Sequence, residues 1–104
     1  MFEAEIERGA KLLDKDDPGW ALENAKHPIN VEYLNMSSGL SCVVGQRGRG
    51  FSEEALRLGI HSTASISFWD ALIAHGFASD NNKDYPQLTA EWRAFILKRR
   101  KDAK

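Results

Sequence analysis

The residues whose types and spacing could support chemistry are concentrated in a glycine- and arginine-rich segment, residues 45–50. Glycines let backbone amides approach a phosphate closely. The order Gly-x-x-Gly-x-Gly differs from the dinucleotide fingerprint, and no Gly-Lys-Ser/Thr motif follows it. The segment therefore predicts a tight turn between two helices. In the alternative interpretation, Arg47 and Arg49 are exposed contacts beside Phe51, because arginine next to an aromatic residue suits protein hot spots and nucleic acid.

The other groups that could support catalysis or metal binding are a single cysteine, three histidines and an acidic N-terminal segment. Cys42 has apolar neighbours, which predicts a buried structural thiol rather than a nucleophile. His27, His61 and His75 lack metal-ligand spacing, and one cysteine cannot seed a structural zinc site. The six acids between residues 3 and 17 are typical of a solvated face. We therefore predict that the chain is not an enzyme, with no catalytic residues, cofactor or metal.

Charge is distributed unevenly along the chain. Residues 1–37 carry eight acids and four bases, whereas residues 93–104 carry six bases and one acid. Either the two ends attract each other in the fold, or each faces a different partner. Basic residues stabilise a helix C-terminus through its dipole, and they also bind phosphates. The basic run that both interpretations must explain is Lys98, Arg99, Arg100 and Lys101.

Two helices are expected at the ends of the chain. Apolar residues at helical spacing predict a helix over residues 3–14, which Pro18 and Gly19 would end. The last helix is expected over residues 86–100, with Pro86 at its first position. Its apolar face, and the tryptophan that follows the first helix, are predicted to lie in the core: Trp20, Leu88, Trp92, Phe95 and Ile96.

Shorter elements are expected between these two helices. Asn30 could cap a helical turn over residues 31–34. Residues 39–44 fit a short buried helix or a strand, and periodicity does not choose between them. Ser52 is the predicted N-cap of a helix that ends at Gly59, and a further helix that includes Trp69 is expected to end at Gly76.

Composition sets the fold class and the compartment. The chain has 104 residues, of which 42% are hydrophobic, and a net charge of −1. These values predict a single domain with a real core, and the helical patterns above predict a mainly α fold, a compact single-domain bundle of about four to five short helices with irregular connections. The domain would span residues 1–104, with residues 98–104 a basic tail open to fraying. One cysteine, an acidic N-terminus and no apolar stretch of membrane-spanning length predict a cytoplasmic protein without membrane contact.

Three blocks of residues carry a resemblance to a known family. They are Leu12-Leu13-Asp14 with Asp17-Pro18-Gly19-Trp20, Leu34-Asn35-Met36-Ser37-Ser38 with Cys42-Val43-Val44-Gly45-Gln46, and Gly76-Phe77 with Tyr85, Leu88-Thr89, Trp92-Arg93 and Ile96. This ordering resembles small uncharacterised proteins of actinobacterial phages and prophages. The resemblance implies a phage-type accessory protein in the host cytosol, which binds and inhibits a host or defence protein in an anti-CRISPR-like manner. Residues 47–50 depart from the family pattern, and the resemblance supplies no catalytic residues.

The leading hypothesis is therefore a non-catalytic protein that binds another protein. The alternative is a nucleic-acid-binding protein that uses the Arg47 and Arg49 loop and the basic C-terminus. Self-association is a further expectation, because three tryptophans and five phenylalanines form a rich aromatic supply. The candidate partner-binding residues are exposed aromatics and arginines, namely Arg47, Arg49, Phe51, Trp69, Arg99 and Arg100.

Overall fold

Four α-helices and two short 3₁₀ helices form the regular structure of the chain, which a computed structural model describes over residues 1–103. No strand occurs within these residues, so the predicted mainly α fold is confirmed. No helix among them is long and apolar enough to cross a membrane. In chain order the elements are α1 (Glu3–Asp16), η1 (Gly45–Arg47), α2 (Phe51–Arg57), α3 (Phe68–Ala74), η2 (Asn82–Asp84) and α4 (Tyr85–Asp102).

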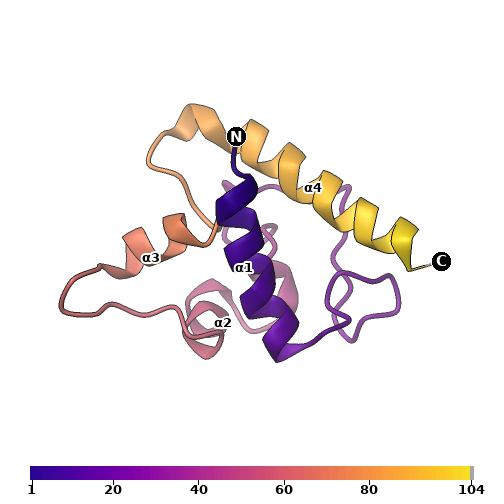
Figure 1. Cartoon of the computed structure of the whole chain (residues 1–104), viewed down its shortest axis with the longest axis horizontal. Helices are drawn as coiled ribbons and strands as arrows, with labels where there is room; N and C mark the ends of the chain where they lie inside the picture. The colour runs from indigo at the N-terminus through magenta and orange to yellow at the C-terminus, as the bar shows by residue number, and fades with distance from the viewer. Residues whose placement is uncertain (104) are drawn as a thin grey trace.

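Helix α1 connects the two sides of the molecule (Figure 1). It begins beside α4, where the backbone N–H of Phe2 donates to Glu91 Oε1 at 2.8 Å. It ends beside α2, where Asp16 pairs with Arg57. Between these ends it packs closely on the chain after α3, because a β-carbon on Gly9 would lie 2.1 Å from the carbonyl oxygen of His75. A side chain at position 9 would therefore push α1 away from this segment.

Helix α4 extends beyond both ends of the predicted range. Leu88, Trp92 and Ile96 are fully buried and Phe95 is partly buried, so the predicted apolar face does pack on the core. Residues 98–102, expected as a tail, form the last turn of α4, and Lys104 lies outside the described residues.

Two glycines end helices α2 and α3 in the same way. Gly59 and Gly76 have φ values of 99° and 74°, which is left-handed backbone that residues with a β-carbon rarely adopt. After each glycine, the next backbone N–H reaches back to a helix carbonyl: Ile60 N–H donates to Ala55 O at 3.0 Å, and Phe77 N–H to Leu72 O at 2.9 Å. Both are Schellman ends with a buried apolar residue after the glycine, as predicted.

The start of α2 differs from the prediction. The helix begins at Phe51, and its N-cap is Gly50 at φ 85° with no side-chain hydrogen bond. Ser52 is therefore inside the helix, and its predicted role as the N-cap is wrong. The helix can begin two residues earlier because Gly50 takes up the positive φ that turns the chain into the helix.

The segment from residue 17 to residue 44 has turns in place of the short elements expected there. Residues 31–34 form a turn that Asn30 closes, since its Oδ1 accepts from the backbone N–H of Glu32 at 3.0 Å. Residues 39–44 form successive turns, so neither the helix nor the strand is found. The side chains of Asn35 and Ser38 accept hydrogen bonds from nearby backbone N–H groups, and such local bonds compete with regular structure in this segment. Packing and contacts with α4 therefore hold its shape.

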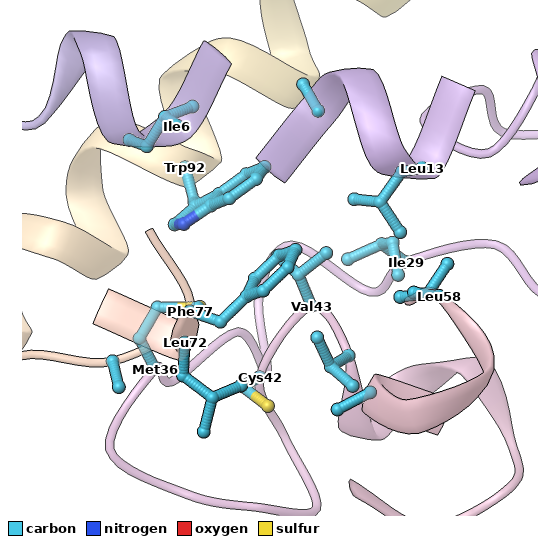
Figure 2. Close-up of a cluster of buried hydrophobic side chains, with 14 of the residues drawn as sticks. Ile6, Leu13, Ile29, Met36, Cys42, Val43, Leu58, Leu72, Phe77 and Trp92 are labelled. Carbon is cyan, nitrogen blue, oxygen red and sulfur yellow. The ribbon is translucent and has the colours of Figure 1, made fainter. Parts of the chain in front are cut away.

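The core is built around aromatic rings (Figure 2). Trp92 lies between α1 and Phe77, with the Phe77 ring stacked at a centroid distance of 5.6 Å. Trp20 meets Trp92 edge-on at 6.1 Å, and both tryptophans are fully buried, as predicted. Cys42 and Met36 fill the region below Phe77. The irregular segment thus contributes as much to the core as the helices do.

Candidate functional site

Phe51 and Trp69, two of the predicted partner-binding residues, line the same small cavity of about 180 Å³. Phe51 is the first residue of α2 and Trp69 the second of α3, so separate helices bring the two rings to one place. The turn around Gly39 lies against Phe51, because a β-carbon on Gly39 would come within 3.7 Å of Phe51 Cβ. The next residue, Leu40, is 81% exposed. We call Leu40, Phe51 and Trp69 the aromatic surface.

Trp69 is held in an exposed orientation by local structure. Ser67 caps α3, since its hydroxyl oxygen accepts from the Asp70 N–H at 3.0 Å. The Trp69 ring is anchored at its edge, where Nε1 donates to Asp80 Oδ1 at 3.2 Å. Even so, Trp69 remains 47% exposed. A large ring fixed in place and open to solvent loses little conformational entropy when a partner covers it.

Cys42 also lines this cavity, with its side chain buried. It is 1% exposed, which confirms the predicted buried thiol. Burial raises the pKa of the thiol, and a hydrogen bond from the Gly45 N–H to Sγ at 3.3 Å opposes that rise only in part. The thiol therefore stays protonated at neutral pH. Within residues 1–103, no group of three or more potential ligands could hold a metal ion.

Arg47 is not an exposed contact, so that prediction is wrong. Its side chain is 6% exposed and is held by two carboxylates. Nε donates to Glu54 Oε2 at 2.7 Å, and Nη2 donates to Asp16 Oδ2 at 2.6 Å. Asp16 lies 31 residues earlier in the chain, at the end of α1. Sequence spacing does not show that α1 ends beside the glycine-rich loop.

Arg57 completes a network of four charged side chains with Arg47, Asp16 and Glu54, which we call the ion cluster. Arg57 donates from Nε to Glu54 Oε1 at 3.1 Å and from Nη2 to Asp16 Oδ2 at 2.8 Å. Burial alone would raise the pKa of Glu54, but the hydrogen bonds from Arg57 and Arg47 outweigh burial and lower it. The same arginines lower the pKa of Asp16, chiefly through the Arg57 hydrogen bond. Both carboxylates are therefore ionised at neutral pH.

The ion cluster was not foreseen from the sequence. Its one local signal was Glu54 three residues before Arg57 on the same helix, a spacing that allows an ion pair. Arg49, predicted as a contact together with Arg47, does lie at the surface. Its side chain is 62% exposed, and its Nε is 3.7 Å from Glu54 Oε1.

Arg99 connects the last helix, α4, to the first helix, α1. It pairs with Asp14 of α1, with Nη2 at 3.0 Å from Oδ2, and its guanidinium lies over the Phe95 ring at 4.7 Å. Asp14 also accepts from Trp20 Nε1 at 2.8 Å. Burial would raise the Asp14 pKa, but the bonds from Arg99 and Trp20 outweigh it, so the pKa is lowered. Of the two expectations for the uneven charge, attraction between the ends is what occurs here.

Arg100 binds the irregular segment instead of facing solvent. Nε donates to the carbonyl oxygen of Ala21 at 2.9 Å, and Nη2 donates to that of Ile29 at 2.6 Å. Arg93, two turns earlier, makes a similar pair of bonds to the carbonyls of Val31 and Leu34. These arginines therefore fasten residues 21–34 to α4. Their guanidinium groups already donate hydrogen bonds to backbone carbonyls within the fold. The basic C-terminus is therefore less suited to binding nucleic acid than its sequence indicates.

Replacing Arg100 with alanine is expected to destabilise the fold by about 1–2 kcal/mol, since two charge-assisted bonds to buried segments are lost from a half-buried side chain. Urea unfolding followed by tryptophan fluorescence measures the loss. Lys101→Ala is the matched control, because Lys101 is exposed and also lies in the last turn of α4. Equal stabilities for the two variants would show that Arg100 does not fasten the segment.

The fold and these contacts define a small all-α protein. Its candidate contact feature is the aromatic surface, in which Leu40 and Trp69 are exposed and Phe51 is partly buried. No family model, curated protein or solved structure matches the chain. Its function must therefore be argued from its own residues.

Proposed function

We propose that this chain is a non-catalytic binding protein that acts on another protein through the aromatic surface. Following the resemblance described above, we further propose a phage-type accessory protein that works in the host cytosol and inhibits a host or defence component. The single observation that carries the proposal is that Phe51 and Trp69, from different helices, line one cavity. Tryptophan is among the residue types most enriched at protein-binding hot spots.

The size of the cavity favours a protein partner. Sites for drug-sized molecules occupy about 300–1,000 Å³. The cavity at the aromatic surface is about 180 Å³, which is less than a small-molecule site needs. A cavity of this size can hold one apolar side chain of a partner protein. The surrounding surface of the partner would then cover Leu40 and Trp69. An anchor side chain in a pocket with aromatic residues at its edge is a common arrangement in protein interfaces.

Replacing Trp69 with alanine is expected to weaken partner binding by about 30-fold or more, the effect of losing a hot-spot residue. The partner is first isolated by pull-down from a lysate of an actinobacterial host, with the wild-type chain as bait. Its affinity for wild type and for Trp69→Ala is then compared by surface plasmon resonance. Trp69 is exposed, so the variant should keep the wild-type fold.

Leu97→Ala is the matched control, because Leu97 is a large apolar residue on α4 that is 46% exposed and lies outside the aromatic surface. Its affinity should equal that of the wild type. A partner that binds both variants as tightly as wild type would contradict the proposal. If a second copy of the chain covers the surface, light scattering would give a dimer mass that Trp69→Ala reduces to a monomer mass.

Nucleic-acid binding through Arg47, Arg49 and the basic C-terminus receives less support. Arg47 is buried between two carboxylates, and Arg99 and Arg100 are bound inside the fold. Of these four arginines, Arg49 alone keeps most of its side chain exposed. Lys98 and Lys101 on α4 are exposed as well, but Lys98 pairs with Asp102 at 3.0 Å. These few charges neutralise few phosphates, and phosphate neutralisation supplies most of the affinity in non-specific binding.

A further inference from the structure

A second and larger cavity lies beside the ion cluster. Its volume is about 550 Å³, within the range of small-molecule sites. The two loops that line it meet beside it, since a β-carbon on Gly48 would lie 3.6 Å from the ring of His27. Basic side chains from both loops and from α2 line it, namely Lys26, His27, Arg47, Arg49 and Arg57.

The arginines of this cavity are held in place before any ligand arrives. Arg47 and Arg57 are oriented by their bonds to Asp16 and Glu54, and Glu54 is fully buried. Arg47 uses Nε and Nη2 in these bonds, and within residues 1–103 its Nη1 makes no hydrogen bond to another residue. A guanidinium that is already oriented loses little entropy when it binds a second anion.

The side chains of three further basic residues of the cavity form no hydrogen bond within residues 1–103. Lys26 and His27 form no hydrogen bond or ion pair with any residue that the structure describes, and both are exposed. Arg49 makes one long ion pair of 3.7 Å and no hydrogen bond in the same part of the chain. The lining thus combines hydrogen-bond donors that are held in place, on Arg47 and Arg57, with donors on exposed side chains that can reorient toward a ligand.

The charges around the cavity leave a positive excess. Lys26, Arg47, Arg49 and Arg57 supply four positive charges, whereas Asp16 and Asp17 in the lining and Glu54 behind it supply three negative charges. The excess is therefore one, before any charge on His27. The net charge of the whole chain is −1, so the cavity is positive against the rest of the molecule. A local excess of this sign attracts anions.

We propose that this cavity binds a phosphomonoester group. A phosphoryl dianion offers several acceptor oxygens, and arginine forks with a nearby lysine match such an acceptor. The volume leaves room for the organic part that carries the phosphate. That part comes either from a small phosphorylated metabolite or from a phosphorylated side chain. This inference is independent of the aromatic surface and of the function proposed for it.

The test is isothermal titration calorimetry of the full chain with inorganic phosphate, as the minimal phosphoryl group, and with two phosphomonoesters. The two monoesters are AMP and a short phosphoserine peptide, which is compared with its unphosphorylated form. At least one probe should bind with one-to-one stoichiometry, and Arg49→Ala should weaken it by about 10-fold or more. Tighter binding of AMP indicates a metabolite, and tighter binding of the phosphoserine peptide indicates a modified side chain. Either result supports the proposal.

Arg49→Ala is the chosen variant because Arg49 is exposed and Glu54 keeps its two closer arginines without it. Arg47 is avoided because its loss would destabilise the fold. Lys101→Ala removes the same charge from α4, outside the cavity, and should leave the affinity unchanged. Absence of binding by every probe at millimolar concentration would overturn the proposal. Equal weakening by both variants would also overturn it. So would tighter binding of an oligonucleotide without a terminal phosphate than of AMP or the phosphoserine peptide.

Discussion

Replacing Trp92 with alanine is expected to lower the free energy of unfolding by about 3–5 kcal/mol, the range for removing a large aromatic side chain from a core. Trp92 has no exposed surface and lies between α1 and Phe77. Its ring also meets Trp20 and Phe95 at 6.1 and 6.0 Å. The indole N–H donates to the carbonyl oxygen of Gly76 at 2.6 Å, so the variant also leaves that carbonyl without its donor.

Chemical denaturation followed by circular dichroism measures this loss, because helix content does not depend on the fluorescence of the deleted ring. Trp69→Ala is the control for removing a tryptophan as such. It should change stability by less than about 1 kcal/mol, since the ring is exposed. A loss of less than about 1 kcal/mol for Trp92→Ala would show that the apolar face of α4 is not part of the core.

Replacing Glu54 with alanine is expected to cost about 3–5 kcal/mol, because it removes one of the two carboxylates that pair with the buried Arg47. Glu54 has no exposed surface, and its carboxylate accepts from Arg47 and Arg57. Asp16 remains to pair with both arginines, which places the expected loss toward the lower end of this range. Urea denaturation at neutral pH measures it.

Glu53→Ala is the matched control, because Glu53 is the exposed neighbour of Glu54 on the same helix. Its effect should stay within about 0.5 kcal/mol. A double variant, Arg47→Met with Glu54→Leu, should recover much of the stability, since apolar residues can replace a buried ion pair. If Glu54→Ala is as stable as Glu53→Ala, the ion cluster does not stabilise the fold.

The pH dependence of stability checks the same cluster. The folded-state pKa values of Glu54 and Asp16 lie below their ordinary values of 4.5 and 3.8. Groups with a lowered folded pKa contribute stability that is complete above the unfolded pKa and is lost as the pH falls toward the folded pKa. Wild-type stability should therefore be level above about pH 5 and fall below it, and Glu54→Gln should reduce the size of that fall.

Local features of the chain could be predicted because their physical causes lie within a few residues. The helices at both ends follow from apolar spacing, and the ends of α2 and α3 follow from Gly59 and Gly76, which take up positive φ. Burial of Trp20 and Trp92 follows from their size and apolar character. The sequence indicates Phe51 and Trp69 as candidate contacts. It does not predict that they line one cavity, because that depends on how α2 and α3 pack.

The errors concern residues whose partners lie far away in the sequence. The turns of residues 36–44 are held by packing and by contacts with α4, so local propensity could not identify them, whereas the turn after Asn30 agrees with the predicted cap. Serine is a favoured N-cap residue, which is why the sequence predicts Ser52 in that role. The positive φ of Gly50 lets α2 begin earlier in the chain. The interpretation of Arg47 as an exposed contact beside Phe51 is wrong, although most arginines are exposed. Its burial requires Asp16 and Glu54 to meet it, and the former lies 31 residues away.

By itself, the sequence determined the mainly α fold, the C-terminal ends of α2 and α3 and the aromatic core, because spacing, glycine conformation and apolar burial act locally. The tertiary structure decided what each arginine does. Arg47 pairs with buried carboxylates, Arg99 and Arg100 hold the chain on itself, and Arg49 remains exposed beside a cavity. The physical reason is that a charge takes its role from the groups within a few ångströms of it, and only the fold sets those neighbours.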